Sequence, residues 1–208
     1  MSDLILFSGG LESSLCGVML RGQPNVAGLH FARKGKESLS SVDCAFDILH
    51  LLNIGIYFHF LEYSQFLNEG AFVYNRNLRM LISASEIAVK YDFDRIVIGT
   101  NDTGGQYPDA TQEAIEVFQD AIQRSMPDEK VPSIVNPLQS MNKWSVARSL
   151  KNLCDKTDLE SIFELGTSCD MFEYESNNKV DIKNHTWGVG CGECQGCENR
   201  RTVCQEVT

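Results

Sequence analysis

The sequence predicts an α/β protein built on an open, doubly wound parallel sheet with a small C-terminal elaboration. Short, continuous apolar runs alternate along the chain with segments whose apolar residues recur at helical spacing. Continuous apolar runs are typical of parallel strands that helices cover on both faces. Hydrophobic residues make up 43% of the 208 residues and charged residues 22%, a composition that can bury a full core.

The expected strands and helices follow from this alternation. Strands are expected at residues 3–7, 25–31, 55–61 and 94–100. Helices are expected at residues 11–21, 38–53, 77–90 and 111–124. Ligands in folds of this class bind beyond the carboxyl ends of the strands, so the residues that follow each strand are the first candidates for a site.

The chain changes in texture after about Met126. Three prolines punctuate the loop-rich stretch that follows: Pro127, Pro132 and Pro137. A helix is then expected over residues 143–154, followed by a polar, irregular region. We therefore expect a single domain, in which an α/β core over residues 1–126 carries an extension over residues 127–208.

Charge and cysteine content limit the classes of protein. The chain has 28 acidic and 18 basic residues, and its net charge of −10 argues against general nucleic-acid binding. No apolar run approaches the roughly 20 residues of a membrane-spanning helix, and MSDLILFSGG is too short and too acidic for a signal peptide. Eight cysteines without a secretory signal fit a reducing compartment, so we expect a cytoplasmic protein without membrane contacts. Cys16 and Cys44 lie on apolar helix faces and are expected in the core.

The segment SGGLESS, residues 8–14, follows the first expected strand and opens the first helix. Two glycines allow a tight turn and a close approach of the backbone to a ligand, and serine hydroxyls and the helix N-terminus supply donors for phosphate. Neither the Walker motif nor the dinucleotide fingerprint occurs, and an ordinary glycine-rich turn is the alternative. The expected nucleotide-binding residues are Phe7, Ser8, Gly9, Gly10, Leu11, Glu12, Ser13 and Ser14.

This loop resembles the PP-loop of the ATP pyrophosphatases, a Rossmann-like α/β family in which it is usually written S-G-G-x-D-S/T. Those enzymes split ATP between the α and β phosphates and transfer AMP to a carbonyl or carboxylate oxygen, and a nucleophile then displaces the AMP. Glu12 stands where the family usually has aspartate, which keeps the charge and adds a methylene group. The resemblance implies ATP as a cosubstrate and catalytic roles for Ser8 and Glu12.

Further segments resemble the 7-cyano-7-deazaguanine synthase (QueC) family, in order from residue 4 to about residue 201. YNRNLR resembles the family's P-G-R-N, IGTNDTGGQYPD its I-G-x-N…Y-P-D, and NPLQSMNK its P-L…K segment. The resemblance implies catalytic roles for Arg76 and Lys143 and a nucleotide contact at Gly99. It also implies that the substrate contacts Asn77, Asn101, Asp102, Tyr107 and Asp109.

The chemistry of these residues leaves alternatives open. Asn101, Asp102 and Asp109 follow the fourth expected strand, where amides and carboxylates can hydrogen-bond a purine-like ring or hold Mg²⁺. The alternative is that the two aspartates cap turns and the following helix. Arg76 or Lys143 would neutralise charge as pyrophosphate leaves, although an arginine at a helix start is often a solvated side chain.

Three cysteines in the run CGECQGC predict a metal site, at Cys191, Cys194 and Cys197. A structural Zn²⁺ requires four ligands in a tetrahedron, and the candidates for the fourth are Cys169, Cys204 and His185. A ferredoxin cluster would need a cysteine where Arg201 stands, so zinc is favoured over iron–sulfur. The family resemblance selects Cys169. A closed four-sulfur site has no open position for water, so we expect a structural role.

The resemblance also implies a reaction. The substrate would be 7-carboxy-7-deazaguanine, a small-molecule deazapurine whose carboxylate attacks the α-phosphate of ATP with the assistance of Mg²⁺. Ammonia would convert the acyl-adenylate into an amide, and a second activation would expel AMP and leave a nitrile. Family members are often homodimers, and the resemblance implies the same association here.

One segment departs from the family. FARKGKES stands where the family usually has F-D-Y-G-Q-R-H, so that Arg33, Lys34 and Lys36 replace acidic, aromatic and histidine members. A solvated basic loop is one interpretation, and altered acceptor recognition is the other. Two alternative functions follow: an enzyme that joins the deazaguanine acid to an amine on a protein or nucleic acid, as in antiphage defence systems, and a nucleotide-binding module without turnover.

Overall fold

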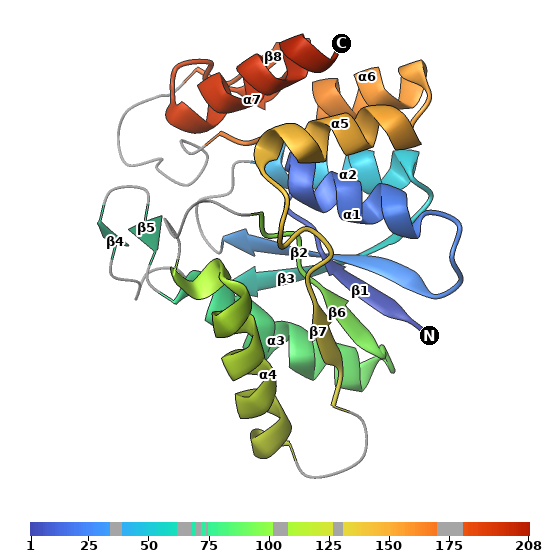
Figure 1. The fold of residues 1–208 in the computed structure, drawn as a ribbon, viewed down its shortest axis with the longest axis vertical. Coiled ribbons are helices and arrows are strands. Elements are labelled where there is room, and N and C mark those ends of the chain that lie inside the picture. Colours follow the sequence, from blue (N-terminus) through green and yellow to red (C-terminus); the bar gives the residue numbers. More distant parts are fainter. Residues whose placement is uncertain are drawn as a thin grey trace.

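The fold is centred on a five-stranded parallel sheet with the strand order β3-β2-β1-β6-β7 (Figure 1). The computed structural model describes residues 1–33, 39–61, 68–69, 72–73, 75–101, 108–126, 131–169 and 181–208. The strands of the sheet are β1 (Asp3–Leu6), β2 (Val26–Arg33), β3 (Gly55–Leu61), β6 (Arg95–Val97) and β7 (Ser133–Val135). β1 lies in the middle of the sheet, where Asp3 pairs with Val26 on one side and Arg95 on the other.

Helices cover both faces of this sheet. They are α1 (Leu11–Leu20), α2 (Leu39–Leu51), α3 (Arg76–Lys90), α4 (Gln112–Ser125), α5 (Lys143–Leu153), α6 (Lys156–Leu165) and α7 (Gln195–Val207). α1 and α2 lie on one face with α5, α6 and α7 stacked beyond them, and α3 and α4 lie on the other face (Figure 1). The predicted doubly wound α/β fold is confirmed.

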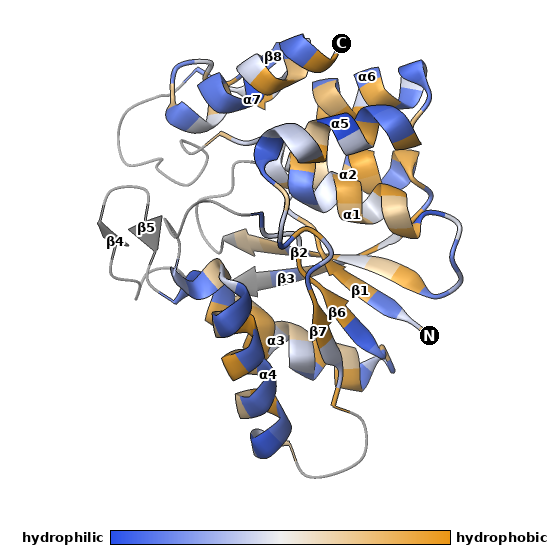
Figure 2. Cartoon of the chain, viewed as in Figure 1, coloured by the Kyte–Doolittle hydropathy of each residue, from blue (hydrophilic) through white to orange (hydrophobic). Residues whose placement is uncertain are grey.

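The two faces of β1 serve two separate cores. Ile5 and the following Phe7 pack with α1, α2 and the C-terminal helices, whereas Leu4 and Leu6 pack with α3 and α4. This alternation follows from the strand geometry, in which successive side chains point to opposite faces. The strands and the sheet-facing sides of the helices are accordingly the most hydrophobic parts of the chain (Figure 2).

Two antiparallel hairpins and a short helix complete the described structure. β4 (Asn68–Glu69) pairs with β5 (Phe72–Val73), and β8 (Lys183–His185) pairs with β9 (Gly188–Gly190). The 3₁₀ helix η2 (Pro108–Ala110) precedes α4. The β8–β9 hairpin lies just before α7, in the segment that carries the cysteine run.

The elements expected before residue 126 are confirmed with small shifts at their ends, and the fourth expected strand is shorter, at Arg95–Val97. The expectation of loops and irregular chain beyond residue 126 was wrong in part, because β7, α6 and α7 form there. Of these three elements, α6 has a local start signal. Asp155 caps α6 by accepting a hydrogen bond from the Asp158 amide at 2.8 Å.

The C-terminal segment contributes directly to the central fold. β7 adds the edge strand next to β6, and α5 packs on α1 while α7 packs on α5. The sheet therefore continues past residue 126, and the division of the domain at that residue stays a prediction. None of the helices formed by the described residues is long and apolar enough to span a membrane.

A buried ion pair joins the amino ends of the two central strands. Arg95 of β6 donates from Nε and Nη2 to the two carboxylate oxygens of Asp3 in β1, at 2.6 and 2.8 Å. The Asp3 side chain is only 1% exposed. A two-point contact of this kind fixes both position and orientation, so it holds β1 against β6.

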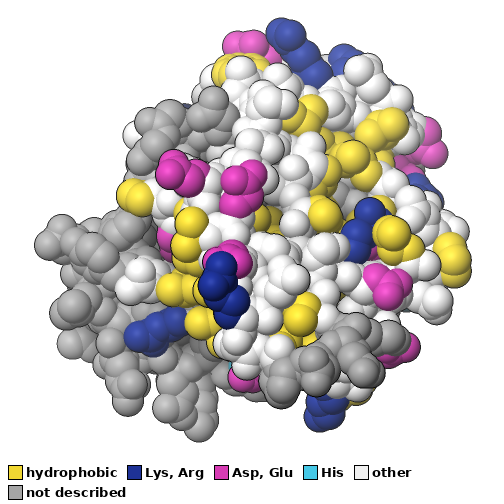
Figure 3. Space-filling view, turned by 60° about the horizontal axis from the view of Figure 1, so that its bottom comes forward, with side chains coloured by type: hydrophobic (Ala, Val, Ile, Leu, Met, Phe, Trp, Pro, Cys, Tyr) yellow, Lys and Arg dark blue, Asp and Glu magenta, His cyan; other side chains and the backbone are white. Residues whose placement is uncertain are grey.

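The molecular surface carries charges of both signs. On the face shown in Figure 3, the described lysine and arginine side chains lie scattered among acidic, polar and hydrophobic ones. A continuous basic surface, which is the usual electrostatic feature of a nucleic-acid binder, is not formed by the described residues on that face.

Candidate active site and metal centre

The phosphate loop lies at the point where the strand order reverses. From β1 the chain crosses to β2 and β3 on one side, while β6 and β7 lie on the other. Ligands of open α/β sheets bind in the crevice at such a switch point, beyond the carboxyl ends of the strands. Residues 8–10 form the turn from β1 into α1, and Gly9 has a φ of 80° that favours glycine.

Hydroxyl groups and carbonyls hold the turn in shape. The Gly10 carbonyl accepts hydrogen bonds from the hydroxyls of Ser13 and Ser14, at 3.1 and 2.8 Å. The Gly10 amide donates to the Ser8 hydroxyl, which itself lies 3.3 Å from the Ser13 hydroxyl. These groups surround the N-terminus of α1, where free N–H groups favour an anion.

The side chains of Phe7 and Leu11 have another role. Both are buried in the core, at 2% and 0% exposure. Only their backbone groups are therefore available to a ligand.

The two cysteines expected in the core, Cys16 and Cys44, are buried. Burial is the main cause that raises the pKa of Cys16 to about 12 and that of Cys44 to about 11.

Three predicted site residues meet beside the loop. The Glu12 carboxylate accepts a hydrogen bond from the Asn101 amide at 3.2 Å and lies 3.9 Å from the Lys143 ammonium group. Glu12 comes from α1, Asn101 follows β6 and Lys143 begins α5. Gly99 faces the same helix, since a Cβ placed there would lie 3.1 Å from the Glu12 carbonyl oxygen.

Two further predicted residues bind each other. Asp109 accepts hydrogen bonds from the Asn77 backbone amide at 3.0 Å and from its side-chain amide at 3.1 Å. Asn77 lies in the first turn of α3, so the Asp109 carboxylate satisfies one of the free amides there. A capping role for Asp109 is therefore real, although it caps α3 rather than the helix that follows it. Thr111 caps that next helix, α4.

The remaining residues singled out in the sequence have less structural context. Arg76 is the first residue of α3 and is half-buried. Asp102 and Tyr107 lie outside the described residues, as do Lys34, Lys36 and the side chain of Arg33. The structure thus brings Glu12, Asn101 and Lys143 together and pairs Asn77 with Asp109.

Asn136 is a structural residue of the site that the sequence interpretation missed. Its side-chain amide donates to the carbonyl and the hydroxyl of Thr100, at 2.9 and 2.8 Å, and its oxygen accepts from the Leu138 amide at 3.1 Å. The Thr100 hydroxyl donates in turn to the Ala110 carbonyl at 3.1 Å. Asn136 therefore ties the ends of β6 and β7 and the helix η2 together. An asparagine before a proline at the end of a short apolar run was the available signal.

The four predicted metal ligands converge. The Sγ atoms of Cys169, Cys191, Cys194 and Cys197 all lie within 4.8 Å of one another. Two of the separations are 3.9 Å, between Cys194 and Cys169, and 4.0 Å, between Cys191 and Cys197. A tetrahedron of sulfurs at the ~2.3 Å bond length of zinc has edges of about 3.8 Å, so the group fits a single metal ion.

Backbone amides surround the sulfur of Cys191. The amides of Glu193 and Cys194 point at it, with N–S distances of 3.5 and 3.4 Å. Burial raises the pKa of the Cys191 thiol, but these amide hydrogen bonds oppose it and the net shift is downward. Because metals bind thiolates, this arrangement prepares a ligand. Cys204 and His185 are outside the four-sulfur group.

The metal centre contacts the phosphate loop through a short segment. The Thr167 amide donates a hydrogen bond to the Gly9 carbonyl at 2.9 Å. The Thr167 hydroxyl donates to the Val189 carbonyl at 2.8 Å and accepts from the Cys169 amide at 3.2 Å. The predicted metal ligand Cys169 therefore lies two residues from a direct contact with the loop. No sequence signal indicates the contact between Thr167 and Gly9, because these residues are 158 positions apart.

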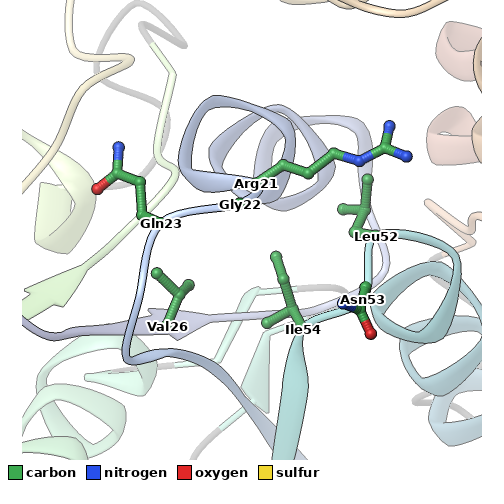
Figure 4. A pocket seen from close by; sticks show the side chains of 7 residues that line it. All are labelled: Arg21, Gly22, Gln23, Val26, Leu52, Asn53 and Ile54. Atoms are coloured by element: carbon green, nitrogen blue, oxygen red, sulfur yellow. The ribbon is translucent and has the colours of Figure 1, made fainter.

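Two cavities lie away from the phosphate-binding side of the loop. One of about 400 Å³ lies among Arg21, Gly22, Gln23, Val26, Leu52, Asn53 and Ile54 (Figure 4). These residues gather where β2 and β3 begin, at the sheet edge opposite the loop. Another, of about 520 Å³, is lined by α2, the end of α6 and the β8–β9 hairpin, with Asp43, Asp47 and Glu164 on its walls.

Comparison with known proteins identifies the family. Residues 62–208 match the family model described as "Queuosine biosynthesis protein QueC". The chain belongs to the QueC family, which confirms the resemblance seen in its motifs.

Curated relatives match most of the chain. It is 28% identical over 244 residues to a 7-cyano-7-deazaguanine synthase from Caulobacter sp. (strain K31), covering 98% of this chain and 89% of that protein. It is 27% identical over 232 residues to one from Nitratidesulfovibrio vulgaris (strain DP4), covering 95% and 90%.

Solved structures show weaker likenesses. NMN synthetase from Francisella tularensis aligns with a TM-score of 0.47 and 14% identity, over 99% of this chain and 84% of that one. The U34-tRNA thiolase NcsA from Methanococcus maripaludis, with its 4Fe-4S cluster, aligns with a TM-score of 0.46 and 14% identity, over 99% and 64%.

Proposed function

We propose that this chain is an AMP-forming, ATP-dependent carbon–nitrogen ligase that converts 7-carboxy-7-deazaguanine and ammonia into 7-cyano-7-deazaguanine. The observation that carries the proposal is the phosphate loop at the sheet's switch point, with Glu12, Asn101 and Lys143 gathered beside it. Membership of the QueC family and relatives named 7-cyano-7-deazaguanine synthase support the choice of substrate.

In this proposal the loop binds the β and γ phosphates of ATP. The Gly9–Gly10 turn and the N-terminus of α1 present N–H groups, and the Ser8 hydroxyl adds a donor. Lys143 places a positive charge where pyrophosphate leaves, and Arg76 is a second candidate for that task. Mg²⁺, when bound, shields phosphate charge, and the Glu12 carboxylate would be its ligand.

The acceptor acid would lie toward the carboxyl ends of β6 and β7. Asn101 and the Asn77–Asp109 pair supply amide and carboxylate groups there, and Asp102 and Tyr107 are further expected contacts. The substrate carboxylate attacks the α-phosphate and pyrophosphate departs. Ammonia displaces AMP to form the amide, and a second activation of the amide oxygen by ATP, followed by loss of AMP, leaves the nitrile. The chain's contribution is to hold the two substrates in line.

The reaction is tested by incubating the protein with ATP, Mg²⁺, ammonia and 7-carboxy-7-deazaguanine. We expect AMP, pyrophosphate and 7-cyano-7-deazaguanine, detected by chromatography and mass spectrometry. Lys143→Met should reduce product formation about 100-fold. Lys156→Met removes an exposed lysine and is the matched control. Full activity of Lys143→Met would remove that residue from the mechanism.

A second acceptor is favoured by the altered segment FARKGKES, which lacks the family's acidic, aromatic and histidine residues. The same adenylate would then be captured by an amine of a protein or nucleic acid. The assay separates the two outcomes, since ammonia as acceptor gives the nitrile and a macromolecular acceptor gains the mass of the deazaguanine acyl group. The absence of ATP–pyrophosphate exchange with every acid offered would instead indicate a nucleotide-binding module.

The ion proposed for the four-cysteine site is Zn²⁺ in a structural role. The sulfur separations fit one tetrahedral ion, whereas a 4Fe-4S cluster places each thiolate on a different iron and so holds the sulfurs farther apart. Mass spectrometry of purified protein should find about one zinc per chain. Stoichiometric iron and sulfide, with a visible absorption band, would contradict the assignment.

A further inference from the structure

Arg200 is a buried arginine that the proposed reaction does not use. It lies on α7 one turn after Cys197, and its side chain is 0% exposed. Its guanidinium group remains protonated in proteins. Among the ion pairs formed by the described residues, no carboxylate pairs with Arg200. A buried cation needs compensating contacts.

Backbone carbonyls provide part of that compensation. Arg200 donates from Nε to the Trp187 carbonyl at 2.6 Å, and from Nη2 to the carbonyls of Ile162 and Phe163 at 3.2 and 3.1 Å. Ile162 and Phe163 belong to the last turn of α6, whose carbonyls lack partners within the helix. The cation also lies at the negative end of the helix dipole. Arg200 thus closes α6 and joins it to the turn between β8 and β9.

The end of α6 leads directly to the phosphate loop. Gly166 follows the helix, and a Cβ placed on it would lie 2.9 Å from the Gly9 carbonyl oxygen and would clash with Nη2 of Arg200. The next residue, Thr167, donates its amide to that same Gly9 carbonyl. The guanidinium group, Gly166 and Gly9 therefore form one continuous contact.

Thiol and carboxyl groups near Arg200 complete its surroundings. Four thiolates around a divalent ion carry a net charge of −2, and Cys197 is one of the four. Burial lowers the pKa of Arg200, and its interactions with Cys204, Glu12, Cys44 and Cys197 oppose this shift. Arg200 also donates from Nη1 to the Ser168 hydroxyl at 3.5 Å, and the next residue in the sequence is Cys169, one of the four cysteines.

We propose that Arg200 is a positioning residue that couples the four-cysteine metal centre to the phosphate loop. With the metal bound, Arg200 holds the end of α6 so that Gly166 and Thr167 support the Gly9 carbonyl. This inference rests on the proposed binding of ATP at that loop. Because coupling between two sites is reciprocal, nucleotide should strengthen metal binding by the factor by which metal strengthens nucleotide binding.

The test measures metal affinity by equilibrium competition with a zinc-selective chelator, with and without saturating α,β-methylene-ATP and Mg²⁺. We expect the nucleotide to raise the metal affinity of the unaltered protein about tenfold. Arg200→Lys keeps the charge but loses the planar fork, so it should retain one metal ion per chain while nucleotide no longer changes the metal affinity. Its affinity for the nucleotide, measured by titration calorimetry, should fall about tenfold.

Two further variants separate positioning from folding. Arg201→Met removes the exposed neighbouring arginine and should behave like the unaltered protein. Gly166→Ala should weaken nucleotide binding while the four-sulfur site keeps its metal, because the new methyl group lies between the loop and the guanidinium group. A positioning role thus changes the coupling without loss of metal, which a purely structural role would not do.

The outcomes distinguish this inference from the proposed function. If the nucleotide binds but leaves the metal affinity of the unaltered protein unchanged, the coupling is refuted and the ligase proposal stands. The coupling would also be refuted if nucleotide raised the metal affinity of Arg200→Lys as much as that of the unaltered protein. If the unaltered protein binds no nucleotide at all, the ligase proposal fails, and this inference fails with it.

Discussion

Glu12 shows how neighbouring groups define the chemistry of a single side chain. A carboxylate next to a phosphate-binding turn repels its ligand unless cations lie between them. Lys143 lies 3.9 Å away, and Asn101 donates a hydrogen bond at 3.2 Å. The side chain is 18% exposed, so it remains accessible to a hydrated metal ion.

Replacing Glu12 tests the arrangement. Glu12→Gln removes the charge and keeps the shape, so ATP–pyrophosphate exchange should fall about 100-fold with little change in melting temperature. Glu12→Asp restores the family's usual residue and should retain exchange. Radioactive pyrophosphate incorporation into ATP measures both rates. Equal rates for Glu12→Gln and the unaltered protein would exclude a role for the carboxylate.

His30 is a buried base beneath the same loop. It is 5% exposed on β2, its Nδ1 lies 2.8 Å from the Phe7 carbonyl oxygen, and among the described residues its Nε2 has no hydrogen-bond partner. Burial lowers the pKa of His30, and the contact with Phe7 opposes this only in part. The folded protein therefore holds a neutral imidazole at pH 7 and takes up a proton there less readily than the unfolded chain.

This difference predicts an acid-dependent loss of stability. Because the folded pKa is the lower one, the stability contribution is complete above about pH 6.5 and is lost as the pH falls toward the folded pKa. Between pH 6.5 and 5 the free energy of unfolding should fall by up to about 1.4 kcal/mol per pH unit through this residue. His30→Asn should have a shallower slope in urea titrations at matched metal content, whereas exposed His50→Asn should not. If the free energy of unfolding of the two variants depended on pH with the same slope, the role of His30 would be refuted.

At the scale of elements, the ion pair between β1 and β6 shows how burial changes the contribution of an ion pair to stability. Asp3 and Arg95 form a two-point contact with the carboxylate 1% exposed. Arg124 and Asp120 form a pair of similar length on the surface of α4, where the side chains are 78% and 61% exposed. The second pair is screened by water and contributes little, whereas loss of Arg95 leaves a buried charge without its partner.

The two pairs give a matched prediction. Arg95→Ala should lower the free energy of unfolding by about 3–5 kcal/mol, and Arg124→Ala by less than about 1 kcal/mol. Adding Asp3→Asn to Arg95→Ala should recover part of the loss, because the orphaned charge is removed. Urea denaturation of the four proteins measures these differences. Similar losses for the two arginine variants would contradict the argument from burial.

Two helices of the C-terminal segment, α6 and α7, were missed because their sequence signals are weak, whereas α5 was predicted. In α7 a buried arginine interrupts the apolar pattern and so hides it. The buried residues at helical spacing are Cys197, Arg200, Val203, Cys204 and Val207. In α6 the buried residues are Leu159, Ile162 and Phe163, which cover only one turn. Both helices depend on tertiary packing, as most short helices do.

Considered as a whole, the molecule consists of a two-sided sheet closed on one face by its own C-terminal segment. α5, α6 and α7 share one core with α1 and α2, so the segment that carries the four cysteines also buries part of the N-terminal half. β8 and β9 are short, and irregular chain connects them to α7. A metal that ties four cysteines together would therefore stabilise the entire face rather than a separate module.

Metal removal should destabilise the molecule accordingly. Chelation is expected to lower the melting temperature by about 10 °C, which for a chain of this size corresponds to a few kcal/mol. Hydrogen exchange should become faster first in α7 and the β8–β9 hairpin, while β1 keeps its protection. Adding zinc back should restore both. An unchanged melting temperature in metal-free protein would show that the site does not support the fold.

Local sequence patterns were sufficient to predict much of the fold and of the candidate site. The alternation of apolar runs and helical spacing predicted the sheet and its first helices, SGGLESS predicted the turn after β1, and the CGECQGC run predicted a metal site. These features depend on residues within one or two turns of each other, so their signals survive in the order of the chain. The family motifs then extended the interpretation to nearly the whole chain.

Contacts between residues far apart in the sequence determined the features that the sequence did not predict. The tertiary structure paired Asp109 with Asn77, brought Thr167 to Gly9, and buried Arg200 between α6 and the hairpin. Such partners are far apart in the chain and leave no periodic trace, because their meeting depends on how the sheet and the helix layers pack. Local motifs therefore predict the type of chemistry at this site. The contacts between the phosphate loop and the four-cysteine site form only when distant segments pack against each other.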